Sequence, residues 1–592
     1  MSSAKCNSVV LLLSASLAGV AQAGQLVSVL DYGADPNGVN PSSTAIQSAL
    51  NVSGKVYFPP GRYSTPVPIT YNGTVEIYGA AGPNGKSLST LTSDQIVFHI
   101  TNGSNSVVRN LNLENVTTPR VIKRDRSDWP DWPWILVDSN ELGFGYQAAS
   151  GDITNNTPQN LLDAIQAPAI GPTILFDASA AASVQPANVL IDSIQGRFLT
   201  IALEGYSYST VQNSNFKAGK DTFAGIYFTN WNFGQARGIG NRALGNTITE
   251  ASNSGIMFGA NDYGVIQNNV ISNVGESGIK TYQGSFCYDS TGQLITSGNI
   301  CPSGTIIVSA RDTHMYIVGN TISGSHYEGI DACSDYAPFT GLYDGYHAIA
   351  YNSVTGNHGL GENSDARHDL VIGNVAQGNG LGGVGDILGD DNYIVENHLD
   401  SNLMRLASGY HDLAVQGDNN VLINNVLTGT NYMAGAGLTN SRFSLAINTS
   451  SPDNQECGNV VNGVLNPPPG GTAPTYAYLT GAVTPGSCSG VAPPILAVPL
   501  APAVTAKLSQ PITLSAAFQG SPTNYQWFKN GVSIVGATTP TLTLSGLRTD
   551  AATYKIVAFN QFGSASSSTT VTEVPPPVGA IVEVVNYALG IR

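Results

Sequence analysis

Charge is scarce in this chain: Asp, Glu, Lys and Arg make up 11% of the 592 residues, and the acids leave a formal net charge of −16. The lack of a basic surplus argues against nucleic acids and anionic membranes as partners. It also disfavours a polyanionic substrate, unless local cations or Ca²⁺ bridge the charge. Long runs with helical periodicity are missing, which excludes helical repeats. Glycine is abundant instead, with 66 residues, as expected of short strands joined by tight turns.

Seven asparagines recur in one sequence frame between Asn246 and Asn425. Each begins a segment such as NVISNVGESGIK at Asn269 or NTISGSHYEGID at Asn320, and successive frames lie 23, 51, 32, 22, 23 and 28 residues apart. A period near 22 residues, built of β-type runs broken by Asn and Gly, predicts a solenoid with one repeat per coil. We therefore predict an all-β protein, a right-handed parallel β-helix. Its stacked asparagine amides should donate and accept along the solenoid and satisfy the turn backbone.

The N-terminal segment, residues 28–62, contains three informative stretches. They are Asp31-Tyr32-Gly33-Ala34-Asp35, a helical Thr44-Ala45-Ile46-Gln47, and Val56-Tyr57-Phe58-Pro59-Pro60-Gly61. The segment resembles the start of the pectate-lyase/polygalacturonase/rhamnogalacturonase/epimerase-like superfamily of β-helix proteins. The resemblance implies an N-terminal helix that caps the solenoid, whose open end would otherwise expose unpaired backbone and apolar surface. Because the superfamily includes hydrolases, lyases, epimerases and phage tailspikes, it implies a fold without selecting an activity.

The two ends of the chain differ from the repeats. Lys5, an apolar run and Ala21-Gln22-Ala23 predict a secretory signal peptide, and hence an extracellular or periplasmic protein. Near the other end, Trp527 and Tyr554 stand where an immunoglobulin-like (Ig-like) β-sandwich has its strand C tryptophan and corner tyrosine. The predicted organisation is a signal peptide (1–23), a β-helix (24–464), a Pro/Gly-rich linker (465–505), an Ig-like domain (506–575) and a C-terminal tail (576–592).

Five cysteines follow the predicted signal peptide. Cys287 and Cys301 flank a 13-residue loop, and Cys457 and Cys488 lie in one Pro/Gly-rich segment. In an oxidising compartment both pairs are predicted disulfides. Cys333 is left over and fits a small core residue. No Cys/His spacing resembles a zinc site. No cofactor is predicted, although Ca²⁺ is possible if the protein is a lyase.

The coil frame predicts which side chains share an outer face. Ile256, Ile279 and Ile330 should point into the core, so the residue after each should point outward. The outward positions of three neighbouring coils form one polar patch: Lys280, Tyr282, Asp331, Asn363 and Asp365. Long insertions leave the coils beside this patch, and aromatic loops there would form the walls of a sugar-binding groove. Six further residues are expected to reach in from turns: His326, Glu328, His347, Glu362, Arg367 and His368.

Two acids of the patch have a separation that suits glycoside hydrolysis. Asp331 and Asp365 should lie one coil apart and two residues along, about 8 Å between Cα atoms, and inverting glycosidases hold their carboxylates about 6.5–9.5 Å apart. Asp335 is a competing partner for Asp331, and His326 is a further catalytic candidate. We predict hydrolysis of a cell-wall or extracellular polysaccharide that is pectin-like or otherwise contains uronate. The expected substrate-binding residues are Lys280, Tyr282, Asn363, Arg367, His368, Tyr336 and Tyr343.

Other functions stay open from the sequence. A polysaccharide lyase would need a base such as His326 or His368, with Ca²⁺ held by Asp331, Asp335 or Asp365. Lys280 is the poorer base, because an adjacent Asp331 favours its protonated form, and a structural ion pair would explain both residues as well. The remaining alternatives are sugar epimerisation and non-catalytic glycan binding by an adhesin with the Ig-like module as a tether. A homotrimer is compatible with the solenoid but is not required.

Overall fold

The computed structural model describes residues 24–574 in part. The segments outside the description are 94, 116–173, 179–183, 219–223, 231–236, 252–253, 282–284, 289–293, 299–305, 310–311, 333–344, 365, 388, 403–410, 429–444, 448–453, 458, 462–493, 508–509, 520–523, 535, 546–549 and 561–562, besides both ends of the chain. The predicted signal peptide and C-terminal tail therefore lie outside the described residues. Within them, no helix combines the length and the hydrophobicity that crossing a membrane requires.

The described solenoid begins with a capping helix, as the sequence predicts. Helix α1 (Ser43–Ser53) buries Ile46, Ala49 and Leu50, which lie on one face at helical spacing. This face packs against β3 (Lys55–Phe58), the second strand of its sheet, and β5 (Ile69–Asn72), the first strand of another. Gly54 ends the helix with φ 70°, a left-handed conformation that favours glycine. The helix thereby covers apolar surface at the end of the first coil.

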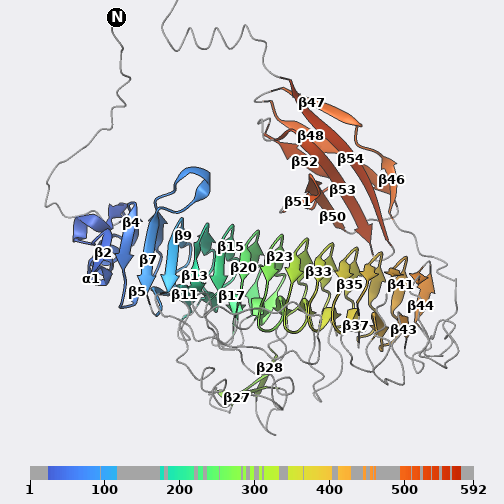
Figure 1. Cartoon of the computed structure of the whole chain (residues 1–592), viewed down its shortest axis with the longest axis horizontal. Helices are drawn as coiled ribbons and strands as arrows, with labels where there is room; N and C mark the ends of the chain where they lie inside the picture. Colours follow the sequence, from blue (N-terminus) through green and yellow to red (C-terminus); the bar gives the residue numbers. More distant parts are fainter. Residues whose placement is uncertain are drawn as a thin grey trace, which may run out of the picture.

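Three long parallel sheets form the right-handed solenoid (Figure 1). Sheet A has 14 strands from β1 (Val27–Ser28) to β44 (Gln455–Cys457), and sheet B has 14 strands from β2 (Asn37–Pro41) to β45 (Val460–Val461). Sheet C has 12 strands: β5, β8 (Phe98–Thr101), β11 (Ile174–Asp177), β14 (Ile201–Glu204), β17 (Ala224–Thr229), β21 (Ser254–Gly259), β25 (Ile279–Thr281), β31 (Ile330–Ala332), β34 (Leu360–Ser364), β37 (Gly382–Ile387), β40 (Leu413–Val415) and β43 (Leu445–Ile447). Successive coils add one strand to each sheet, which confirms the predicted parallel β-helix.

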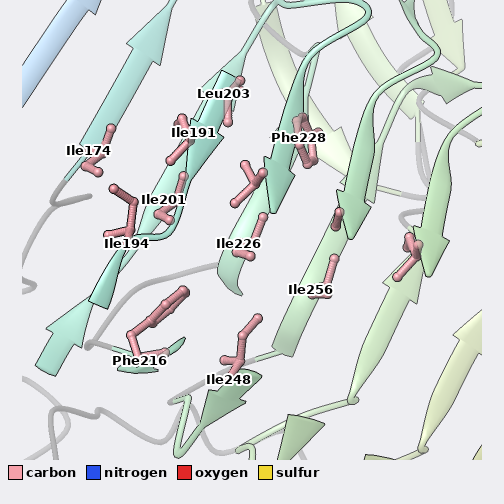
Figure 2. Packing of buried hydrophobic residues seen from close by; sticks show 14 of the residues in the cluster. Ile174, Ile191, Ile194, Ile201, Leu203, Phe216, Ile226, Phe228, Ile248 and Ile256 are labelled. Carbon is pink, nitrogen blue, oxygen red and sulfur yellow. The ribbon is translucent and has the colours of Figure 1, made fainter. Parts of the chain in front are cut away.

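Rows of aliphatic side chains fill the interior. Along sheet C, Ile201, Ile226 and Ile256 lie in register on adjacent strands and are fully buried, and Figure 2 shows how they pack. The row continues through Ile279 and Ile330, which confirms the inward orientation expected of these positions. Burying one such side chain contributes about 1.5–3 kcal/mol. The core is thus one continuous stack along the solenoid.

The framed asparagines form the predicted ladder. Asn269 donates from its backbone N–H (2.9 Å) and its Nδ2 (3.0 Å) to Oδ1 of Asn320. Its Nδ2 also donates to the backbone oxygen of Ala243 at 2.9 Å, so turn backbone inside the solenoid is satisfied. The same contacts join Asn246, Asn269, Asn320, Asn352, Asn374, Asn397, Asn425 and Asn459 in order. Asn459 adds one coil beyond the seven that the sequence frame identifies.

A second strand-rich unit follows the solenoid. Its five-stranded sheet has the order β47 (Ala503–Lys507), β54 (Gly563–Val574), β53 (Ala552–Asn560), β50 (Asn524–Lys529), β51 (Val532–Ser533). Trp527 and Tyr554 lie in its separate core, and Tyr554 Oη donates to the backbone oxygen of Asp550 at 3.0 Å, the contact expected of a corner tyrosine. Assignment to the Ig-like class stays a prediction. Strand β46 (Ile495–Val498) pairs with β49 (Ala517–Gln519) of this unit, so the linker ends before the predicted residue 505.

The C-terminal unit packs on the outer face of sheet A (Figure 1). An apolar row on the solenoid meets Val557 and Phe559 of β53: Val318, Ala350, Ile372, Val395 and Ile423. The Tyr351 ring lies edge-on to Phe559, with 5.6 Å between centroids. A polar contact accompanies this apolar contact: Ser564 donates from its N–H (3.1 Å) and Oγ (2.5 Å) to the Glu396 carboxylate. The unit is therefore docked along several coils.

Candidate functional site

The predicted outer row of sheet C exists. Lys280 of β25 pairs in register with Asp331 of β31, and Asp331 pairs with Asn363 of β34. These three side chains alternate with the inward Ile279 and Ile330, as strand geometry requires. Asp331 retains only 8% exposure although it faces outward. The structure therefore brings together three of the predicted site residues.

Lys280 is held between two carboxylates. Its Nζ lies 2.5 Å from Oε1 of Glu276, in the turn before β25, and 3.5 Å from Oδ2 of Asp331. Burial by itself would lower the pKa of Lys280, but the charges of Asp331 and Glu276 and the hydrogen bond to Glu276 raise this pKa well above its usual value. Lys280 is thus a fixed ammonium ion. This ion cannot serve as a base at neutral pH.

Glu328 is a carboxyl beside Lys280 and Asp331 whose pKa is clearly raised. It lies three residues before Asp331, half-buried, and its Oε2 accepts a hydrogen bond from Ser277 Oγ at 3.3 Å. Burial, followed by the negative charge of Asp331, raises the pKa of Glu328 to about 7, although Lys280 acts in the opposite direction. Two nearby carboxyls with different environments are typical of acid–base sites. We call Glu276, Lys280, Glu328 and Asp331 the sheet C carboxylate cluster.

The outer row changes character along sheet C. On the N-terminal side of Lys280 the row is apolar and consists of Leu175, Ala202, Tyr227 and Met257. Tyr227 Oη donates to Oε1 of Glu204 at 3.2 Å. Ala202, Tyr227 and Met257 are buried although they face outward. The carboxylate cluster therefore begins where an apolar, buried strip ends.

His326, predicted as a catalytic residue, packs inside a turn. Its ring stacks on that of His358 with 5.0 Å between centroids and 15° between planes, and Tyr327 contacts it edge-on at 5.3 Å. The side chain is 6% exposed. In this arrangement one ring face is occupied and the ring has little access to a substrate, so a catalytic role for His326 stays a prediction.

Arg367 and His368 make contacts away from the carboxylate cluster. Arg367 forms an ion pair with Asp391, with 3.2 Å between Nη2 and Oδ2. The His368 ring stacks on Tyr346 with 4.8 Å between centroids, in a column that also contains His314 and Tyr263. Both residues lie on the turn that follows β34. Substrate binding by them stays a prediction.

The sequence predicts that Glu362 and His347 reach the site from turns, but the structure places both elsewhere. Glu362 lies within β34 in register with the inward Ile330 and is 1% exposed, so its carboxyl belongs to the core. His347 is buried in the turn before β32 (Ala348–Ala350), where its Nδ1 accepts from the N–H of Met315 at 3.2 Å. Burial lowers the pKa of His347, which keeps it neutral. The strand register and the turn backbone together fix both positions.

Several predicted residues lie outside the described part of the chain: Tyr282, Asp335, Tyr336, Tyr343, Asp365, Cys301, Cys333 and Cys488. Cys287 and Cys457 belong to β26 (Ser285–Tyr288) and β44, but their side chains are not described, so both disulfides stay predictions. Among the described side chains, no group of three or more His, Cys, Asp and Glu is arranged to hold a metal ion.

Known proteins share the fold over most of the chain. The receptor-binding protein of bacteriophage Det7 is 15% identical, with a TM-score of 0.52, over 94% of this chain and 92% of that chain. The receptor binding domain of the siphovirus 9NA tailspike is 16% identical, with a TM-score of 0.50, over 92% of this chain and 98% of that chain. Among curated proteins, none matches the sequence significantly.

A family profile matches the N-terminal part. It is described as rhamnogalacturonase A/epimerase, pectate lyase-like, and covers residues 26–127, the capping helix and first coils. This agrees with the resemblance of residues 28–62. The chain is therefore a right-handed parallel β-helix protein whose N-terminal part matches the rhamnogalacturonase A/epimerase, pectate lyase-like family.

Proposed function

We propose that this protein is a secreted glycoside hydrolase that cleaves a polysaccharide on the outer face of sheet C. The observation that carries the proposal is the pairing of Glu328, whose pKa is raised to about 7, with Asp331 beside the fixed Lys280 ammonium ion. A carboxyl that keeps its proton near neutral pH can act as a general acid, while a neighbouring carboxylate acts as its counterpart. The family name of residues 26–127 includes polysaccharide-cleaving enzymes, which supports a glycan as substrate.

The proposed step assigns one role to each carboxyl. Glu328 donates its proton to the glycosidic oxygen as the bond from that oxygen to the anomeric carbon breaks. Asp331 accepts a proton from the water that attacks the anomeric carbon, so one water is consumed and two sugar ends form. Lys280 holds Asp331 in place through its 3.5 Å contact and limits the accumulated negative charge. Asp335 and Asp365 remain candidates for the second carboxylate, because both follow strands of this face in the sequence.

The charge balance favours an uncharged glycan segment over a polyuronate. Lys280 already lies against two carboxylates, so its charge is not available to a substrate carboxylate. The insertions that follow β25 and β31, residues 282–311 and 333–344, contain three aspartates and one arginine. A polyanion would therefore meet net repulsion at the cluster. This proposal replaces the pectin-like substrate expected from sequence with a neutral polysaccharide.

The test is digestion of a panel of neutral and uronate-containing polysaccharides by the mature chain. Three variants accompany it: Glu328→Gln, Asp331→Asn, and Asp400→Asn as a control on sheet B, where Asp400 accepts from Gln377 Nε2 at 3.1 Å. We expect new reducing ends on a neutral polymer and a loss of about 10²- to 10⁴-fold in rate for the first two variants only. Equal rates in all four proteins would refute the assigned roles.

The same digestion distinguishes hydrolysis from two other reactions, lyase cleavage and epimerisation. A lyase produces unsaturated uronates that absorb in the ultraviolet, and Ca²⁺ removal by EDTA would abolish its activity if Ca²⁺ supports it. An epimerase changes sugar composition without new chain ends. Binding of a glycan without either change would favour a non-catalytic receptor or adhesin. This last function has some support, because both structures reported above are receptor-binding proteins by their titles.

A further inference from the structure

One carboxyl group occupies a core position of the solenoid. Glu362 of β34 pairs in register with Ile330 on one side and with Val384 of β37 on the other, and both neighbours are fully buried and apolar. The row in which it stands contains Ile256, Ile279, Ile330, Val384 and Leu413 on the neighbouring strands. The neighbouring coils in this stretch thus all place an aliphatic side chain at the position where this coil places a carboxylic acid.

The carboxyl has no compensating contact among the described residues. Both Oε1 and Oε2 of Glu362 are buried and lack a hydrogen-bond partner within the described part of the chain. An ionised carboxylate in such surroundings costs several kcal/mol, far more than the neutral acid. Burial raises the pKa of Glu362 well above its usual value. The neutral acid is therefore the form that fits the folded solenoid.

The elements packed against β34 offer no inward counter-charge in the described structure. They are β31, β33 (Ser353–Thr355), β36 (Val375–Gln377) and β37. Their inward side chains include Ile330, Val354, Ala376 and Val384, all fully buried. Among the described side chains, the titratable residue on these strands is Asp331, which lies in the outward row, and the preceding turns carry His326, Glu328 and His358. None of these residues forms a hydrogen bond with Glu362 that would stabilise its charge.

We propose that Glu362 is a proton-operated switch within the solenoid. When Glu362 is protonated, β34, which also carries Asn363, stays packed between β31 and β37. When Glu362 is ionised, β34 loosens from both strands. The stability effect stands on its own. Its effect on catalysis rests on the proposed function, since β34 flanks the strand that carries Asp331. A pH above the folded-state pKa of Glu362 would therefore strain the coil beside the site, and a pH below that pKa would consolidate it.

The direction of the pH effect follows from proton linkage. In the unfolded chain Glu362 ionises near its ordinary pKa, about 4.3, while the folded protein keeps the proton to a higher pH. Between these two values the folded state binds one proton more than the unfolded state. The stabilisation is complete below the unfolded pKa and is lost as pH rises through the folded pKa, with up to tenfold in the unfolding equilibrium constant for each pH unit.

The test compares denaturation midpoints of the mature full chain between pH 4 and pH 9 for the wild type, Glu362→Gln and Glu362→Ile. Gln keeps the shape without ionising, and Ile restores the aliphatic row. We expect the variants to gain stability relative to the wild type as pH rises, with the smallest difference at pH 4. Asp400→Asn is the control and should follow the wild type. Other acids with raised pKa, such as Asp412, act equally in all these proteins, so the difference isolates Glu362.

Two results would overturn the proposal: wild-type and Glu362→Gln curves that run parallel at every pH, or a wild type that gains on the variant as pH rises. If Glu362→Gln does not fold, the comparison of the wild type with Glu362→Ile, together with infrared spectroscopy, still tests the proposed switch. The wild type should show a protonated carboxyl band at neutral pH that Glu362→Ile lacks, and an unchanged spectrum would contradict the switch. These readouts need no activity, so an inactive protein with the pH-dependent difference refutes only the hydrolase proposal.

Discussion

Lys280 and Asp331 lie in register on adjacent strands of sheet C, with 3.5 Å between Nζ and Oδ2. The same ammonium group lies 2.5 Å from Glu276, and Glu328 is close enough for its pKa to respond to both Asp331 and Lys280. The lysine therefore lowers the pKa of the Glu328 carboxyl, against the effects of burial and of Asp331. If that group is catalytic, changing the lysine must change the pH dependence of the reaction.

Replacing Lys280 with Met should raise the pKa of Glu328, because the ammonium charge lowers that pKa in the wild type. We expect the limb of the pH–rate profile that reports the general acid to move up by about one pH unit. Lys217→Met is the control, since Lys217 forms an ion pair with Glu250 at 3.2 Å on sheet B. An unmoved profile in Lys280→Met would separate Glu328 from the chemistry.

The asparagine ladder should dominate local stability. In Asn320→Ala, two donors of Asn269 lose their acceptor, and Ile266 O loses the hydrogen bond from Asn320 Nδ2. Asn352 Oδ1 loses one of its two donors and keeps the backbone N–H of residue 320. Buried unsatisfied groups of this kind should lower the free energy of unfolding by about 2–5 kcal/mol in all. Denaturant titration measures the change. Asn51→Ala on the exposed face of α1 should stay within about 0.5 kcal/mol of the wild type, and a comparable loss there would contradict the account.

The docking of the C-terminal unit depends on Phe559. This ring is fully buried in the apolar contact with sheet A and lies against Tyr351. Phe559→Ala should cost about 3–5 kcal/mol and separate the unfolding of the two units into two calorimetric transitions. Val532→Ala, at a residue that is 64% exposed, is the control. A single unchanged transition in Phe559→Ala would show that the apolar contact does not hold the unit.

The fold is well predicted from sequence because its period leaves traces that survive insertions. Asn269 and Asn320 are 51 residues apart in the chain, yet the frame identifies them as neighbours, since the following Gly-Ile steps match. The outer row of Lys280, Asp331 and Asn363 follows from the same frame by strand alternation. Features that repeat in every coil are thus predictable from sequence.

Features that break the repeat are harder to predict. The frame that places Ile330 inward also places Glu362 inward, but a carboxyl is rarely buried, so the sequence interpretation assigns it to a turn. The docking surface does leave a trace in the sequence, because strands such as YIV from Tyr316 and LVI from Leu370 are apolar on both faces. The raised pKa of Glu328 depends on burial by neighbours, which residue spacing does not reveal.

The central claim is that Glu328 is a proton donor in polysaccharide hydrolysis, and the most direct test is the initial rate of cleavage against pH for wild type and Glu328→Gln. The account predicts that the wild-type rate falls as pH rises through about 7, where Glu328 loses its proton. It also predicts that the variant is slower by about 10²- to 10⁴-fold at neutral pH. A variant with the wild-type rate and the same pH profile would contradict the claim.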